Sequence, residues 1–268
     1  MTPCRTHRLA ALAAILVAAV VPGQEPAPPP LDPALTDQLK ELKTLVSDRK
    51  MEADFQAIGL IQNLSRDVEK KHPKDQEKLA KGLGDVFRTG KLRPAERDIL
   101  YREAADALAK LGTVGGKELA KVVEDKRFDD NLPLRGHLLL ALGRTQDDKQ
   151  VELLTDIAVR SPHDELRAAA GEALGSYTKL EIKARREIVK ALIREWGAIH
   201  QLATQPESND PNGPIDLAPQ NAQRRLRTIE GKWNQTLQKL TGTSNAQFAD
   251  WQRWLNKNPN WVPPGAGR

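Results

Sequence analysis

Few residues of this sequence have the types and spacing that catalysis or metal binding requires. There is no H-E-x-x-H pair, no Gly-rich phosphate loop and no G-x-S-x-G turn. The one cysteine, Cys4, excludes an internal disulfide and any multi-cysteine metal centre. The dipeptide His163-Asp164 fits a helix start better than a metal site, and His137, beside three leucines, fits a packed or rim position. We therefore expect no catalytic residue, no cofactor and no metal site, with an unrecognised enzyme as a minor alternative.

A calcium loop is the other ligand chemistry to consider. Asp210, Asn212 and Asp216 lie in segment 204–220, which is rich in Pro, Asn, Asp and Gly and has no apolar period. Their spacing does not follow the D-x-[DN]-x-[DN]-G pattern with its late glutamate. The segment is therefore predicted to be a loop or linker.

Tryptophans near the C-terminus could bind a ligand or seal a core. Four of the five tryptophans follow residue 230. Trp233, Trp251 and Leu255 lie on the predicted inward stripes of two helices, whereas Trp254 and Trp261 are predicted to be the more exposed pair. Exposed indole rings can stack on sugars or anchor a protein interface. A glycan- or small-ligand-binding module is therefore one alternative function.

The composition predicts that helices position these side chains. Hydrophobic residues make up 39% of the chain and aromatic residues 4%, with Ala and Leu at most apolar positions. Few β-branched clusters occur, which disfavours sandwiches and barrels. The fold class is predicted to be all-α.

Three segments of the chain can be laid over one another. They are LYREAADALAKLG (100–112), LRGHLLLALG (134–143) and LRAAAGEALG (166–175). In each, a leucine precedes the Ala-Leu leucine by eight residues, and those leucines (108, 142 and 174) are 34 and 32 residues apart. Periods of this size are typical of helical repeats.

Each copy is predicted to be a short helix followed by a second helix. Gly136 and Gly171, inside two of the first helices, indicate close approach of a neighbouring helix. The second helices carry apolar residues at i, i+3 and i+4 spacing. We predict a proline in the first turn of each first helix: Pro94, Pro133 and Pro162. We also predict that a glycine in the left-handed conformation ends each of these helices: Gly112, Gly143 and Gly175.

The strings LRAAAGEALG and LRGHLLLALGRTQDDKQVELL resemble HEAT-like repeats of the phycobilisome-lyase type, over about residues 75–200. The string WNQTLQKLTGTSNAQFADWQRWLNKNPNW is similar to a C-terminal motif of exported HEAT-repeat proteins of planctomycete-type bacteria. The resemblance implies a right-handed α-solenoid of HEAT-like helical hairpins with helical caps. It also implies scaffolding or docking rather than a particular chemistry.

The remaining segments are assigned around this array. Residues 32–74 are predicted to form an N-terminal helical hairpin cap that begins at Asp32-Pro33 and buries Phe55 among its apolar stripe. The array covers 75–203, the loop or linker 204–220, a Trp-rich helical pair 221–257 and a tail 258–268.

Charged residues off the apolar stripes indicate a binding surface. If the second helices line the concave face, as in the HEAT family, Lys121, Glu152, Asp156, Lys190 and Arg194 project into one groove. A long groove of mixed charge suits a protein or peptide. The basic runs 183–194 and 224–227 are otherwise predicted to be solvated faces.

The first residues predict export. Arg5, His7 and Arg8 precede the apolar run 9–21, which is shorter than the roughly 20 residues of a membrane span. We expect a signal peptide at 1–23 and a Pro-rich linker at 24–31, with an uncleaved anchor or a buried helix as the alternative. Removal of residues 1–23 leaves 39 basic and 36 acidic side chains, a small excess that argues against nucleic acid as a partner.

Together these features predict an exported protein, periplasmic or extracellular, without a membrane span in the mature chain. Its leading function is a non-enzymatic scaffold or adaptor that binds a protein or peptide through the concave surface.

Overall fold

The computed structural model describes residues 28–205 and 217–263, and within them every regular element is helical. The predicted signal peptide, the first half of the Pro-rich linker (24–27), the calcium-loop candidates Asp210, Asn212 and Asp216, and the last five residues of the tail lie outside the described residues. The α-helices are α1 (Leu35–Val46), α2 (Asp54–Leu64), α3 (Pro73–Arg88), α4 (Ile99–Lys110), α5 (Gly112–Val123), α6 (Leu132–Arg144), α7 (Val151–Arg160), α8 (Asp164–Leu174), α9 (Ile182–Ala203), α10 (Ala218–Thr241) and α11 (Phe248–Lys257). The all-α prediction is thus confirmed over these residues.

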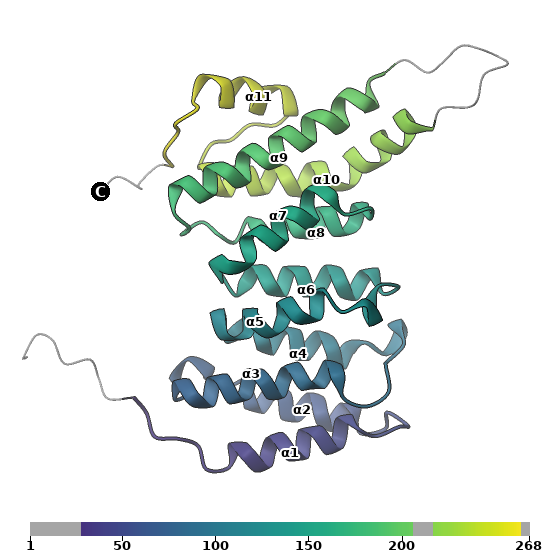
Figure 1. Ribbon diagram of the computed structural model, residues 1–268, viewed down its shortest axis with the longest axis vertical. Helices are drawn as coiled ribbons and strands as arrows, with labels where there is room; N and C mark the ends of the chain where they lie inside the picture. Colours follow the sequence, from purple (N-terminus) through teal and green to yellow (C-terminus); the bar gives the residue numbers. More distant parts are fainter. Residues whose placement is uncertain (1–27, 206–216, 264–268) are drawn as a thin grey trace, which may run out of the picture.

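The helices form two layers along the long axis of the molecule (Figure 1). In the even layer, α2, α4, α6, α8 and α10 each pack on the next. In the odd layer, α1 packs on α3, α3 on α5 and α7 on α9, while α5 reaches the short 3-10 helix Asp148–Gln150 that leads into α7. Helix α11 packs on α9 at one end of the stack (Figure 1). Leucine, alanine and valine side chains between the layers form the core.

The repeat period appears in the even layer because the aligned segments become α4, α6 and α8. Their equivalent leucines, Leu108, Leu142 and Leu174, are fully buried. The following helices bury the predicted stripes, for example Leu119 and Val122 in α5 and Leu192 in α9. A helix of this length buries its apolar side only by packing on its neighbours, which is why the stack is continuous.

The predicted helix starts are correct at one of three prolines. Pro133 lies in the first turn of α6, where the Asn131 side chain accepts a hydrogen bond from the Leu134 N–H at 3.0 Å. Pro94 instead begins the 3-10 helix Ala95–Arg97, and Pro162 lies two residues before α8. Those two predictions are wrong because a proline also fits the extended or turn backbone that leads into a helix.

Of the three glycines predicted to be left-handed, Gly112 alone is, with φ of +57°. Gly143 is inside α6 and Gly175 has φ of −65°, so both predictions are wrong. A Cβ at Gly143 would lie 2.6 Å from the Ala173 carbonyl oxygen, which shows that this glycine permits helix contact. Gln146, at φ of 52°, makes the left-handed turn after α6.

The two mid-helix glycines also differ. A Cβ at Gly171 would lie 2.2 Å from the Trp233 indole nitrogen, so the predicted close approach is confirmed there. At Gly136 the nearest atom would be the Ala169 Cβ at 3.8 Å, an ordinary contact, and the prediction is wrong.

At the N-terminal end, α1 begins at Leu35 rather than at Asp32-Pro33, and the Asp32 carboxylate accepts a hydrogen bond from the Ala34 N–H at 2.9 Å. Phe55, predicted to be inward, is 84% exposed. The inward side of α2 is instead formed by Ala57, Ile61 and Leu64, one helical turn apart.

Candidate functional site

The structure separates the five charged residues predicted for one groove. Glu152, Asp156 and Arg194 line a groove between α7 and α9, here called the α7/α9 groove. Lys190 and Arg194 line a second one between α9 and α11. Lys121 belongs to neither.

The α7/α9 groove has a volume of about 730 Å³. Helix α7 turns Leu154 and Ala158 into the core, which leaves Glu152 and Asp156 exposed one turn apart on the outer side. Helix α9 buries Ile188 and Leu192 and exposes Arg194. Small and apolar side chains cover the base: Val151, Val159, Leu180, Ala184, Ile188 and Ala191.

The charges around this groove are mostly negative. Five carboxylates and two arginines line it: Asp148, Glu152, Asp156, Glu181 and Glu187; Arg160 and Arg194. Asp156 pairs with Arg160 at 2.6 Å, and Glu187 pairs with Lys190 at 3.1 Å. Within the described residues Glu152 and Glu181, on opposite walls, have no ion-pair partner. The groove therefore presents free carboxylates above an apolar base.

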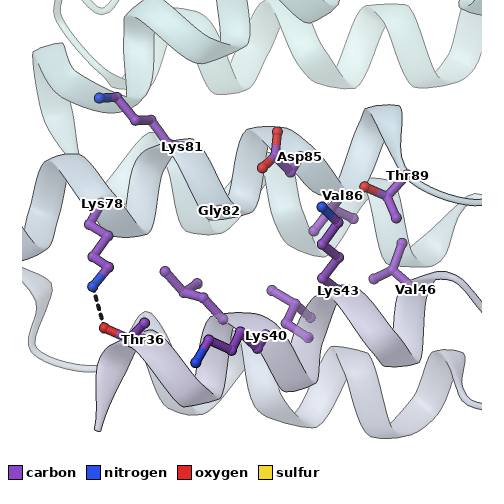
Figure 2. Close-up of a pocket in the computed structure, with 12 residues that line it drawn as sticks. Thr36, Lys40, Lys43, Val46, Lys78, Lys81, Gly82, Asp85, Val86 and Thr89 are labelled. Carbon is purple, nitrogen blue, oxygen red and sulfur yellow. Dashed lines mark hydrogen bonds between the residues drawn. The ribbon is translucent and has the colours of Figure 1, made fainter. Parts of the chain in front are cut away.

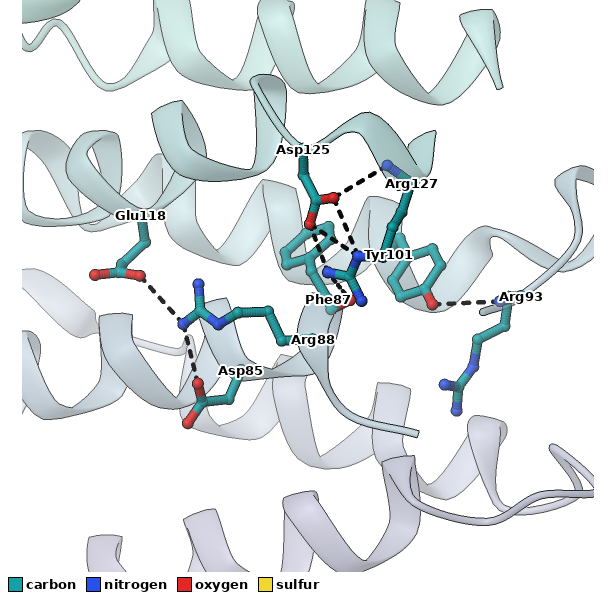
Figure 3. A network of polar contacts seen from close by, with 8 residues as sticks. All are labelled: Asp85, Phe87, Arg88, Arg93, Tyr101, Glu118, Asp125 and Arg127. Atoms are coloured by element: carbon teal, nitrogen blue, oxygen red, sulfur yellow. Dashed lines mark hydrogen bonds and ion pairs between the residues drawn. The ribbon is translucent and has the colours of Figure 1, made fainter. Parts of the chain in front are cut away.

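Lys121 pairs with Glu118, a member of the polar network that ties α3 to α5. Figure 3 shows Glu118 in this network with Arg88 and Asp85. The Lys121 ammonium contacts the Glu118 carboxylate at 2.7 Å, and the other Glu118 oxygen is 3.4 Å from the Arg88 guanidinium. Arg88 also pairs with Asp85 at 2.9 Å. Glu118 is buried, so this carboxylate needs its cations, and Lys121 has a structural partner.

The same network continues to the loop after α5 (Figure 3). Arg127 donates a hydrogen bond to the Phe87 carbonyl at 3.3 Å. Its hydrogen bonds to Asp125 outweigh burial and lower the pKa of that carboxyl below the ordinary value. These contacts hold α3, α5 and the loop together.

The groove between α9 and α11 was not predicted as a unit. Its volume is about 730 Å³, and Lys190, Arg194 and His200 line it without a carboxylate. The His200 ring stacks on Phe248, with ring centroids 5.2 Å apart. Neither residue has a local sequence signal, because the contact joins positions 48 residues apart in the chain.

The C-terminal tryptophans are mostly buried. Trp233 and Trp251 are fully buried, as predicted. Trp261 is only 6% exposed, so its predicted exposure is wrong, and Trp254 is half-buried between Trp251 and Trp261. Arg186 of α9 causes this by donating hydrogen bonds to the Trp261 carbonyl at 2.7 and 2.9 Å, which hold the chain end against the helix.

The basic runs are less solvated than predicted. Arg185 is 7% exposed and donates to the Thr178 carbonyl at 2.8 Å, and burial lowers the pKa of its guanidinium. Arg225 pairs with Asp164 at 2.6 Å across α8 and α10. Only part of each basic run is therefore available to a partner.

Of the two histidines considered as ligands, His137 has a side-chain partner and His163 marks a helix start. His137 Nε2 lies 2.9 Å from the Asp106 carboxylate, which also contacts Arg144. His163 precedes α8 without a side-chain cap hydrogen bond. Across residues 28–205 and 217–263, no three His, Cys, Asp or Glu side chains are grouped to hold a metal ion. In the same residues no helix combines the length and apolarity of a membrane span.

In comparisons with known proteins, no family model, curated protein or solved structure matches this chain.

Proposed function

We propose that this protein is an exported, non-enzymatic adaptor whose α7/α9 groove binds a cationic segment of a protein or peptide partner. One observation carries the proposal: Glu152 and Glu181, on opposite walls above an apolar base, have no ion-pair partner among residues 28–205 and 217–263. An excess of negative charge around such a base favours positive charge in the partner and steers its approach.

The wider architecture in this proposal is a right-handed α-solenoid of HEAT-like hairpins with helical caps. The two layers of successive helices and the burial of the aligned leucines support it. Export rests on the charged and apolar pattern of residues 1–23. An array of this kind offers extended surfaces between its helices, which suits docking better than catalysis.

The partner is expected to be a protein segment rather than nucleic acid, because the carboxylates of this groove would repel phosphates. The glycan alternative required two exposed indole rings, and Trp261 is buried. No observation favours that alternative as a second function.

The test is fluorescence anisotropy with the mature protein and a labelled peptide of alternating lysine and leucine. The double variant Glu152→Lys/Glu181→Lys should weaken binding roughly tenfold, since each exposed ion pair contributes about 0.2–1 kcal/mol and reversal adds repulsion. The matched control is Glu165→Lys/Glu230→Lys on α8 and α10, which changes the net charge equally at exposed positions. The two double variants are matched in position as well, because each replaces one glutamate at the start of a helix: Glu181 at α9 and Glu165 at α8.

Equal weakening by both double variants would show attraction to the overall charge and would refute a role for this groove. Unchanged binding in Glu152→Lys/Glu181→Lys would refute it as well. Circular dichroism should show the same helix content in both variants.

A further inference from the structure

Another groove lies in the odd layer, between α1 and α3, and is here called the α1/α3 groove (Figure 2). Its volume is about 270 Å³. Leu42, Val46 and Val86 form its base and are almost fully buried, and Leu39 beside them is partly buried. This groove is part of the same layer as the α7/α9 groove but lies in the first two helices of that layer.

Its charge is opposite to that of the α7/α9 groove. Four lysines line it, Lys40 and Lys43 from α1 and Lys78 and Lys81 from α3, against the single acid Asp85 (Figure 2). Asp85 is already paired with Arg88 at 2.9 Å. An anion entering the groove would therefore meet lysines and no free carboxylate.

The four lysines differ in how far they are engaged. Lys40 pairs with Asp37 at 2.9 Å, and Lys78 hydrogen-bonds to the Thr36 hydroxyl. Lys43 and Lys81 are exposed and, within the described residues, have no ion-pair partner. One of these lysines belongs to each wall: the Lys43 ammonium points from α1 toward α3, whereas that of Lys81 points away from α1 (Figure 2). A ligand that meets both must therefore extend across α3.

The positive charge continues beyond the end of the groove. Past Val46 and Thr89 the two helices lead into loops that place Arg49, Lys50 and Lys91 around a neighbouring hollow. The nearby Asp48 carboxylate accepts hydrogen bonds from the backbone N–H groups of residues 50, 52 and 53, which lower its pKa. That aspartate is therefore satisfied within its own turn.

The base of the groove is closed by Leu39, which packs directly on α3. A Cβ at Gly82 would lie 2.5 Å from Leu39 Cδ2, so this glycine lets Leu39 lie against the α3 backbone. The volume is below the roughly 300–1,000 Å³ of pockets that enclose small molecules. It suits one or two apolar side chains that belong to a longer ligand.

We propose that the α1/α3 groove is a docking site for an acidic peptide segment of a partner protein. One or two apolar side chains of the segment lie on Leu39 and Val86, and its carboxylates meet Lys43 and Lys81. A lipid surface fits less well, because flat headgroups reach the lysine ammonium groups but not the recessed base. This site goes beyond the proposed function, since the α7/α9 groove selects the opposite charge.

The test is anisotropy of the mature protein with a labelled peptide of glutamate and leucine about as long as α1. Lys43→Glu/Lys81→Glu should weaken binding about tenfold. Lys43→Gln/Lys81→Gln should weaken it less, because it removes the attraction without adding repulsion. The matched control Lys110→Glu/Lys179→Glu should have little effect; Lys110, like Lys43, lies in the last turn of its helix.

Three further measurements distinguish the alternatives. A peptide with serine in place of leucine should bind several-fold more weakly, which tests the apolar base without changing the protein. Glu152→Lys/Glu181→Lys should leave binding of the acidic peptide unchanged, because those residues line the α7/α9 groove. The test of the α1/α3 groove is therefore independent of the test of the α7/α9 groove. Sedimentation with phosphatidylserine-containing vesicles tests the membrane alternative.

The proposal is overturned if the acidic peptide does not bind, or if the control variant loses as much affinity as Lys43→Glu/Lys81→Glu. It is also overturned if serine replaces leucine without loss, or if vesicles and not the peptide depend on Lys43 and Lys81.

Discussion

Replacing Gly171 by alanine should destabilise the protein, whereas the same change at Gly136 should stabilise it. Both glycines lie inside helices of the even layer, where alanine is favoured by about 1 kcal/mol on local grounds. They differ only in what surrounds the missing Cβ. At Gly171 the new methyl group would lie 2.2 Å from Trp233 Nε1 and 2.4 Å from its Cδ1, and at Gly136 nothing is closer than 3.8 Å.

The magnitude follows from what Trp233 would lose. This ring is fully buried, and its indole N–H donates to the Arg167 carbonyl at 3.1 Å. Forcing an extra methyl group into a packed core costs about 1–3 kcal/mol, and leaving the buried indole N–H unpaired costs about 1–3 kcal/mol. After the gain in helix propensity, Gly171→Ala should lower the free energy of unfolding by about 3 kcal/mol, or the melting temperature by roughly 6–12 °C. Gly136→Ala should raise that free energy by about 0.5–1 kcal/mol.

Urea unfolding measures both effects. Helix stacks can unfold in segments, so circular dichroism and tryptophan fluorescence should give coincident curves before free energies are compared. Gly231→Ala in α10, where no atom lies within 4 Å of the new Cβ, is a second control and should behave as Gly136→Ala does. If Gly171→Ala and Gly136→Ala shift stability in the same direction, the packing argument is refuted.

Two further predictions concern buried and partly buried charges. Arg93 has no exposed side-chain area and pairs with Asp54 at 2.8 Å. Asp54→Ala, which leaves that buried cation unpaired, should lower the free energy of unfolding by about 3–5 kcal/mol in chemical unfolding. Asp54→Leu/Arg93→Met should recover most of this loss, and an equal loss in both variants would attribute the penalty to packing. Burial raises the pKa of Asp106, but hydrogen bonds from His137 and Arg144 outweigh this and hold the pKa below its ordinary value. Because the folded-state pKa is the lower one, this stabilisation is present above the unfolded-state value and is lost as pH falls through the folded-state value. The stability of the unmodified protein should therefore fall more steeply below about pH 4 than that of Asp106→Asn, and parallel curves would contradict the assignment.

Much of the candidate site depended on information that no local pattern carries. The apolar spacing places Glu152 and Asp156 on the outer side of one helix, and this prediction needed only the helical period. Whether Arg194 joins them depends on which helices pack together. The Lys121–Glu118 pair is local, three residues apart in α5, but the burial of Glu118 beside Arg88 of α3 is not. The separation of charge into an acidic and a basic groove was likewise unpredicted, because α1 and α3 received no site assignment.

The sequence by itself determined the helical class, the approximate places of the helices and the leucines that face the core. These properties arise from interactions within one or two turns of chain, and Leu108, Leu142 and Leu174 carry that signal directly. Only the tertiary structure decided that Trp261 is buried, that a Cβ would clash at Gly171 but not at Gly136, and that Lys43 and Lys81 line one groove. Burial and charge pairing are set by atoms from distant parts of the chain, so they exist only once the layers have packed.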